Sequence, residues 1–404
     1  MSFTSGRDLY TVALGRAVST LGNEVALIAL MLRVHDSGDG SWAIAGLLAA
    51  GTLPLVLFAP LAGSLVDRYD SRLLIVASSL IQALFTGVLA FTHSLPALLA
   101  LVAATGAGSA VANPTFSALV PQLAPGELLA RANSLLQGSN VVAMLAGPAV
   151  GGLLVGLTGG AEVPLLVDAG TFLAITAAGL VIRTRRRPER HATPPRWREG
   201  LSAVTGDSVL VAVYTLLVLF VIAGEMVNIA DVFLARDTFG ASAFTYGAMS
   251  VVFSAGMLAG SVLAGRIGAP RRIVAAIPLS AAVMAAAIAL IGLSPALAGL
   301  PMAFCCLLVL GVGNGALNVH TPTLVALRTP AALLGRAMST LAGLTRGAGM
   351  LAIGLGGVVT SLLSPPAVFT ASGVACLLVV GATLPALRSA RHAVAVAGDV
   401  PAAA

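Results

Sequence analysis

The sequence predicts an all-α polytopic membrane protein with twelve transmembrane helices, arranged as two pseudo-symmetric six-helix bundles. The composition is 58% hydrophobic and 9% charged, with a mean hydropathy of +0.99, and therefore lacks the polar surface of a water-soluble globule. Twelve apolar stretches each approach or exceed the ~20 residues that a helix needs to cross a bilayer. In addition, part of the first half recurs in the second half.

The twelve stretches follow one another with short polar connections, apart from one longer one in the middle. The first six have approximate cores at 9–33, 42–62, 73–92, 96–120, 134–158 and 163–183. The second six lie at 209–235, 243–266, 272–293, 297–325, 336–362 and 366–387.

The internal repeat has an offset of 205 residues. Gly106, Asn113 and Arg131 recur as Gly311, Asn318 and Arg336, and neighbouring Gly, Pro, Leu, Ala and Ser positions recur with them. We therefore expect an N-terminal bundle at 1–183, a cytoplasmic basic linker at 184–208, a C-terminal bundle at 209–387 and a disordered cytoplasmic tail at 388–404.

Arginines predict the orientation. They concentrate in the even-numbered connections, above all between Arg183 and Arg198, whereas the opposite loops carry little more than Arg33 and Arg236. The positive-inside rule then places both termini in the cytoplasm. The basic linker lies at the inner leaflet, where anionic lipid attracts each Arg by roughly 1 kcal/mol; we favour a role in topology over specific lipid recognition.

Several function classes are excluded or disfavoured. The chain has no lysine, so it has no Walker-type phosphate loop and does not use ATP through that motif. The net charge of +6 comes mostly from arginines in short loops, which argues against nucleic acid as a partner. Cys305, Cys306 and Cys376 lie in apolar stretches without His or acidic residues at ligand spacing. We expect no metal site, no cofactor and no enzymatic activity.

A cluster of charge interrupts the apolar sequence between the second and third stretches. It contains Gly63, Asp67, Arg68 and Arg72, and charges of this density belong at a membrane surface. The pattern Gly-x-x-x-Asp-Arg-x-x-x-Arg resembles the signature loop between helices 2 and 3 of the major facilitator superfamily of secondary transporters. The resemblance implies a conformational gate in which Asp67 pairs with the start of helix 11, at Arg336.

The resemblance extends over nearly the full length and is closest to the enterobactin-exporter-like branch. Its marks include Arg16-x-x-Ser19-x-x-Gly22, Leu53-Pro54 and Ala132-Asn133-Ser134. A further segment resembles the helix-5 antiporter motif, through Gly147, Pro148, Gly151 and Gly152.

This branch implies proton-coupled efflux of a drug, siderophore or other metabolite across the bacterial inner membrane, driven by the proton gradient. One departure is that Val102 stands where the helix-4 antiporter motif has Arg. Proton coupling must therefore use other residues.

Acidic residues inside the apolar stretches are the candidates for proton coupling. An ionisable residue at a helix centre costs roughly 2.5 to 3.5 kcal/mol on insertion scales, so we expect a function for Glu24 and Glu225. Asp231 and Asp168 rank lower because they lie nearer the outer ends, where they can reach interfacial water. The alternative for Glu24 is a structural ion pair with Arg16 or Arg346.

Polar residues at helical spacing predict a cavity for a small-molecule substrate. Arg16 and Asn23 share a stripe with Glu24, and Asn228 shares one with Glu225. The cavity candidates are Arg16, Asn23, Asn113, Asn228, Asn314, Asn318 and Arg346; hydrogen bonding between helices is the alternative role for the amides.

Three functions remain open at this point. An exporter, working as a monomer by alternating access, is the first. A proton-coupled importer of a nutrient is the second, and a membrane sensor or scaffold without transport is the third.

Overall fold

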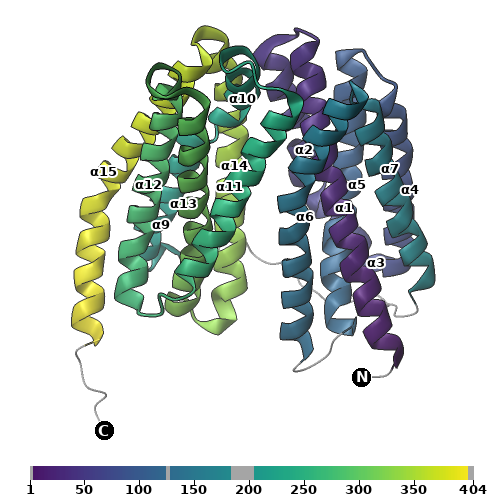
Figure 1. The fold of residues 1–404 in the computed structure, drawn as a ribbon. Coiled ribbons are helices and arrows are strands. Elements are labelled where there is room, and N and C mark those ends of the chain that lie inside the picture. Colours follow the sequence, from purple (N-terminus) through teal and green to yellow (C-terminus); the bar gives the residue numbers. More distant parts are fainter. Residues whose placement is uncertain (1–2, 124–127, 183–203, 399–404) are drawn as a thin grey trace. The chain divides into compact units, whose positions relative to one another are not determined.

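The computed structural model describes residues 3–123, 128–182 and 204–398, and these residues form helices and short connections with no β-strand. Twelve helices in this part of the chain are long and apolar enough to cross a membrane (Figure 1). Each coincides with one of the twelve predicted stretches, so the predicted fold class is confirmed.

One of the twelve spans, Ser208–Thr238, is made of three elements, α9, α10 and η1, and is not a single uninterrupted helix. The first half contains α1 (Phe3–Asp36), α2 (Gly40–Leu57), α3 (Ala59–Arg68), α4 (Ser71–Ala90), α5 (Leu95–Leu123), α6 (Leu128–Thr158) and α7 (Glu162–Val181). The second half contains α9 (Ser208–Gly224), α10 (Val227–Phe233), the π-helical turn η1 (Leu234–Thr238), α11 (Ala243–Ala264), α12 (Pro270–Leu297), α13 (Gly299–Arg328), α14 (Ala331–Leu362) and α15 (Pro365–Gly398).

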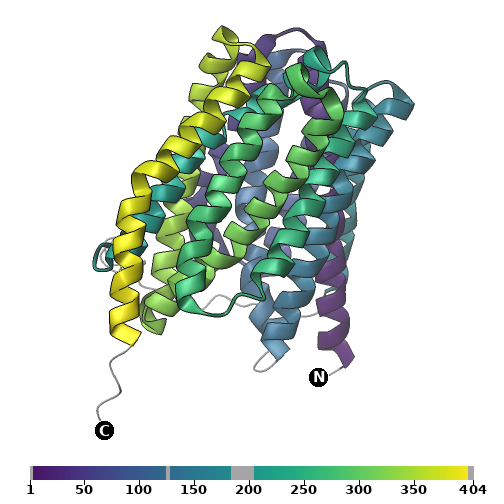
Figure 2. The same cartoon turned by 60° about the vertical axis from the view of Figure 1, so that its left-hand side comes forward.

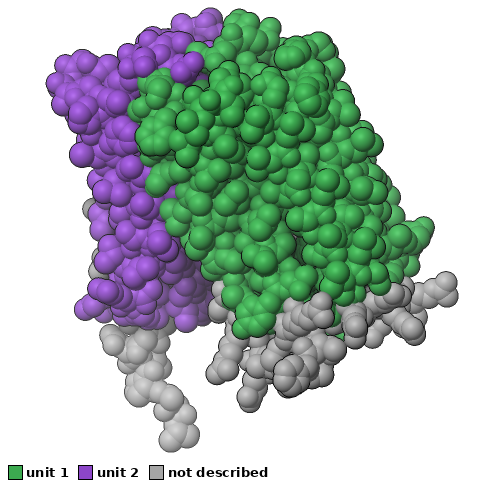
Figure 3. Space-filling view, turned by 45° about the vertical axis from the view of Figure 1, so that its right-hand side comes forward, with its two compact units in different colours: residues 1–193, 241–251 green, residues 194–240, 252–404 purple. Residues whose placement is uncertain are grey.

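The chain divides into two compact units. Unit 1 contains residues 1–193 and 241–251, and unit 2 contains residues 194–240 and 252–404 (Figure 3). Helix α11 therefore begins in unit 1 and ends in unit 2. Most of the predicted linker lies outside the described residues, and α15 continues to Gly398 through the first part of the segment for which the sequence predicts a tail.

Both units use the same pattern of helix packing. In unit 1, α1 packs on α6 and α7, and α4 packs on α5 and α7. In unit 2, α9 packs on α14 and α15, and α12 packs on α13 and α15 (Figures 1 and 2). These pairs correspond one to one under the sequence repeat, which shows that the repeat is structural.

The repeat is also visible in the cores. Val120 and Ala132 are buried in the core of unit 1, and Val325 and Ala337, 205 residues later, are buried in the core of unit 2. Tyr214 joins the unit 2 core and donates a hydrogen bond from its hydroxyl to the Ala337 carbonyl, at 3.0 Å. The offset of 205 therefore defines structurally equivalent positions.

The charged cluster at 63–72 is largely helical, whereas the sequence predicts a loop. Helix α3 runs through it to Arg68, and only Tyr69 and Asp70 separate α3 from α4. Asp70 caps α4 by accepting a hydrogen bond from the Arg72 amide at 2.8 Å, which satisfies one of the unpaired amides of a first helical turn. Pro60 near the start of α3 has no amide hydrogen, which favours the break that separates α2 from α3.

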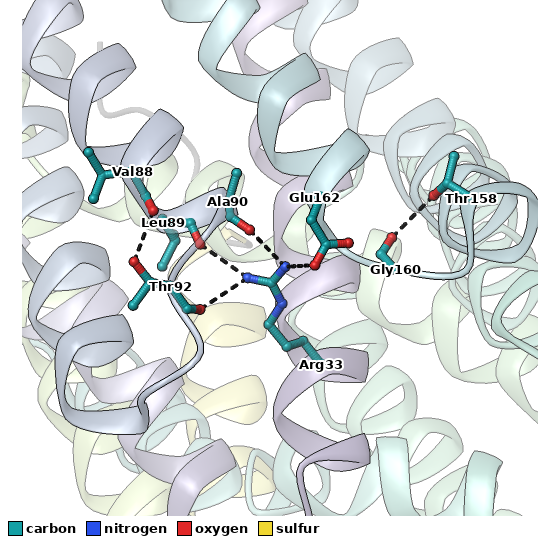
Figure 4. A network of polar contacts seen from close by, with 8 residues as sticks. All are labelled: Arg33, Val88, Leu89, Ala90, Thr92, Thr158, Gly160 and Glu162. Atoms are coloured by element: carbon teal, nitrogen blue, oxygen red, sulfur yellow. Dashed lines mark hydrogen bonds and ion pairs between the residues drawn. The ribbon is translucent and has the colours of Figure 1, made fainter.

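Arg33 ties three helices of unit 1 together (Figure 4). From α1 it donates hydrogen bonds to the carbonyls of Leu89, Ala90 and Thr92 at the end of α4, at 3.0–3.3 Å. It also pairs with Glu162 in the first turn of α7, at 2.7 Å. The last carbonyls of a helix lack partners within the helix, and a cation there interacts favourably with the helix dipole. Arg33 is therefore a cap for α4.

We expect Arg33→Gln to lower the free energy of unfolding by about 2–3 kcal/mol, because it removes charge-assisted hydrogen bonds from carbonyls that then lack partners. Glu162→Gln should cost less than about 1 kcal/mol, because Glu162 is 42% exposed and the ion pair is screened by solvent. Thermal unfolding in detergent, followed by circular dichroism, measures both. Equal losses would show that the ion pair, and not the cap, carries the stability.

Candidate functional site

A polar cavity of about 60 Å³ lies inside unit 1. Four helices line it: α1, α4, α5 and α7. The lining residues are Arg16, Ser19, Thr20, Asn23, Ser79, Gln82, Ser109, Ala112, Asn113, Phe116, Phe172 and Ile175. Three of the predicted cavity residues, Arg16, Asn23 and Asn113, are thus brought together.

Arg16 lies over an aromatic ring in this cavity. Its guanidinium carbon is 5.6 Å from the centre of the Phe116 ring, a distance typical of a cation–π contact. Among the described residues, no carboxylate pairs with Arg16. Glu24, about two turns further along α1, forms no ion pair with it, so the structure does not contain the Glu24–Arg16 pair that the sequence left as an alternative.

Hydrogen bonds join the helices around the cavity. Gln82 of α4 donates to the Ser109 hydroxyl of α5 at 2.9 Å, and Thr20 of α1 donates to the Asn140 side chain of α6 at 3.2 Å. Gln82 and Ser109 are absent from the predicted cavity residues. A signal for Gln82 is present in the sequence, since Ser78, Ser79 and Gln82 recur at helical spacing in an apolar stretch.

Glu24 packs directly against the antiporter-like segment of α6. A Cβ added at Gly147 would overlap the Cβ of Glu24, and one added at Gly151 would lie 3.0 Å from the Val25 carbonyl oxygen. The Glu24 side chain is half-buried and has no hydrogen-bond partner among the described residues. On the other side of α6, Gly152 meets Gly247 of α11 with the two backbones in contact. The glycines of this segment are therefore helix contacts on both sides.

Asp168 of α7 is 2% exposed, so it does not reach interfacial water and this part of the prediction is corrected. Thr171 donates a hydrogen bond to its carboxylate at 3.2 Å, and the same carboxylate lies against Gly22 of α1. No cation pairs with it among the described residues. It is a buried acid between α1 and α7.

Glu225 of unit 2 lies where the span Ser208–Thr238 is interrupted. Helix α9 ends at Gly224 and α10 begins at Val227, and the Asn228 amide bonds to the Glu225 carbonyl three residues back, at 3.1 Å. The Glu225 side chain is half-buried, and a Cβ added at Gly349 of α14 would lie 2.7 Å from its carboxylate. The sequence predicts one regular helix here. Irregular turns inside a helix often mark hinges.

The two acids are not at equivalent positions in their units. Under the offset of 205 that aligns the two cores, Glu225 corresponds to Thr20, and Glu24 corresponds to Ile229. The acids therefore differ by about one helical turn in register. What they share is the local contact, because each packs against a glycine of the fifth helix of its own unit.

The remaining cavity candidates lie in unit 2. Asn318 donates to the Asn314 side chain at 2.8 Å, so these two amides interact on one face of α13. Asn228 is exposed and Asp231 is half-buried. Arg346, which the sequence offers as a cavity residue or as a partner of Glu24, is exposed.

The gate residues are only partly described. Gly63 and Arg68 lie in α3, and Arg72 of α4 donates to the Leu180 carbonyl of α7. Arg336 is half-buried in α14. The side chain of Asp67 lies outside the described part of the structure, so its pairing with Arg336 stays a prediction.

Comparison with known proteins identifies a family of transporters. A sequence model described as Major Facilitator Superfamily matches residues 12–292. Macrolide efflux protein A of Streptococcus pyogenes is 24% identical over 308 residues, covering 74% of this chain and 76% of that protein. An uncharacterized MFS-type transporter of Bacillus subtilis, YfiS, is 23% identical over 93% of this chain and 92% of its own length.

Solved structures share the fold. A point mutant of the nucleoside transporter NupG superposes with a TM-score of 0.74 at 13% identity, covering 94% of this chain and 99% of that one. A bacterial homologue of the iron transporter ferroportin in an inward-facing state gives a TM-score of 0.73 at 15% identity, covering 97% and 100%.

We expect Gly147→Ala to destabilise the protein by about 1–3 kcal/mol, because the new methyl group overlaps Glu24 and forces α1 and α6 apart. Gly138→Ala is the matched control, since a Cβ at this exposed position of the same helix meets nothing within 4 Å. The control should be neutral or stabilising, as Gly→Ala is in an unobstructed helix. Thermal unfolding of the purified variants tests the difference, and equal melting temperatures would contradict the contact.

Proposed function

The chain belongs to the major facilitator superfamily, because the family model covers most of its length, and from this premise we propose that it exports a small molecule in exchange for protons. The substrate class is a drug, siderophore or other metabolite. Export takes place across the bacterial cytoplasmic membrane by alternating access of a monomer, with both termini in the cytoplasm. Asp67 and Arg336 act as the conformational gate, and the basic linker lies against anionic lipid.

One observation carries the proposal: the Glu24 side chain packs against Gly147, within the segment that resembles the antiporter motif. Acids inside membrane spans commonly belong to proton relays. Here the acid touches α6, whose glycines and Pro148 favour bending, so protonation of Glu24 changes the charge at a place where α6 can bend. The contact between Glu225 and Gly349 repeats this arrangement in unit 2.

Export rather than import is supported by relatives that are described as macrolide efflux proteins. The proton gradient supplies enough free energy to drive export, since each proton that moves through 100 mV releases about 2.3 kcal/mol. That free energy sustains a concentration ratio of tens, because each 1.4 kcal/mol corresponds to about a factor of ten.

The test is accumulation of dyes, macrolides and siderophores in a bacterial host that lacks its own pumps, with and without an uncoupler. We expect the wild type to lower accumulation of at least one compound and the uncoupler to abolish the effect. Glu24→Gln and Glu225→Gln should raise accumulation to the level of the host without the transporter, because neither amide can carry a proton. Glu162→Gln, which changes an exposed acid outside both contacts, is the control and should export normally.

Other outcomes separate the alternatives. Accumulation that rises with the wild type would show import. Export that survives both Gln substitutions would place proton coupling elsewhere, with Asp168 and Asp231 as the next variants.

A further inference from the structure

We propose that the cavity of unit 1 binds a carboxylate group of the transported substrate, with Arg16 as its counter-charge. This inference rests on the proposed export function and narrows its substrate class to carboxylate-bearing compounds. It depends on three properties of the cavity: its lining, the setting of Arg16, and its size.

Besides four apolar residues, the lining consists of neutral polar groups and one cation, and it contains no acid. Ser19 and Ser79 are buried and have hydroxyls without a hydrogen-bond partner among the described residues, and the amides of Asn23 and Asn113 are likewise without one. Hydroxyl and amide groups can donate to an anionic oxygen. The cavity is therefore suited to an anion and unsuited to a cation.

Arg16 contacts an aromatic ring and forms no ion pair among the described residues, which leaves its donors available. The guanidinium carbon lies 5.6 Å from the centre of the Phe116 ring, and a ring contact of this kind uses none of the N–H groups as hydrogen-bond donors. The planar fork of a guanidinium matches the two oxygens of a carboxylate, which can accept two parallel hydrogen bonds. The contact with Phe116 thus leaves the fork of Arg16 available to a planar anion.

Two other arginines of this protein already have anionic partners. Arg33, on the same helix, pairs with Glu162, and Arg328 of unit 2 pairs with Asp207 at 2.6 Å. Arg16 has no such partner among the described residues, and an uncompensated cation within a membrane span is costly. A ligand that carries a carboxylate supplies the missing charge.

The size of the cavity fits a carboxylate group. A cavity needs roughly 10–15 Å³ to hold one water, so about 60 Å³ accommodates a few atoms. Acetate is accordingly the smallest probe of the site, and acetamide is its neutral counterpart of nearly equal shape.

The binding experiment uses the full-length protein in phosphatidylcholine nanodiscs. Acetate replaces chloride at constant ionic strength, and saturation-transfer NMR of the methyl protons reports binding, beside the same measurement with acetamide. We expect wild-type protein to bind acetate and not acetamide, and Arg16→Gln to weaken acetate binding by about 10- to 100-fold, the loss typical of a hydrogen bond to a charged group. Arg16→Lys should bind with intermediate affinity, because it keeps the charge and loses the fork.

The matched control is Arg266→Gln, which removes an exposed arginine of unit 2 and should bind acetate like the wild type. Equal binding of acetate and acetamide would overturn the proposal, as would undiminished acetate binding by Arg16→Gln. If Arg16→Gln does not fold, Arg16→Lys and the comparison of acetate with acetamide on the wild type still decide it.

The transport experiment distinguishes the substrate's own carboxylate from a free anion. Export of a carboxylate compound is compared with export of its methyl ester, in wild type and Arg16→Gln. We expect export of the acid alone, lost in Arg16→Gln. If acid and ester are exported equally while acetate binding still depends on Arg16, the cavity is an anion site but does not bind the substrate's carboxylate. That result would overturn the proposal. If neither the carboxylate compound nor any of the dyes, macrolides and siderophores is exported while acetate still binds, the proposed export function is overturned instead.

Discussion

Charge inside apolar helices is the constraint on which this structure depends. A bilayer offers no water to solvate an ion, so each charged side chain within a span needs a protein partner, a cavity or a ligand. Arg33 meets the requirement with the carbonyls of α4 and with Glu162, and so joins three helices of unit 1. Arg16 meets it with a ring and a polar cavity, which is why the same residue type is structural at one position of α1 and a candidate for ligand binding at another.

Glycine sets how closely the charged helices approach their neighbours. Gly147 and Gly349 each leave room for an acidic side chain of the first helix of their unit, and Gly22 leaves room for Asp168. Small residues at helix interfaces are the usual means of close packing in membranes. In this protein the close contacts bring acidic side chains against backbone, so a change of charge at an acid acts directly on a helix interface.

The two units share a packing plan without sharing every functional residue. Equivalent core positions such as Ala132 and Ala337 are buried alike, yet Glu24 and Glu225 differ by about one turn in register. The interruption between α9 and α10 at Glu225 also has no counterpart in α1. The internal repeat therefore accounts for the scaffold, whereas the placement of the acids is particular to each unit.

The sequence by itself determined the twelve spans, the family and the repeat of 205 residues. Apolar length and periodicity depend on local composition, and an apolar stretch inside a bilayer must form a helix to satisfy its own backbone hydrogen bonds. The sequence predicted Arg16, Asn23 and Asn113 as cavity candidates together with four residues of the second half, and the structure places these three in the polar cavity of unit 1.

Tertiary structure alone decided which side chains meet. The contacts of Arg16 with Phe116, of Asp168 with Gly22 and of Glu24 with Gly147 join residues far apart in the chain, and no local pattern encodes such pairs. The break at Glu225 likewise lies in a stretch whose apolar composition favours a continuous helix. Spacing along one helix fixes which residues share a face, but packing between helices decides what that face touches.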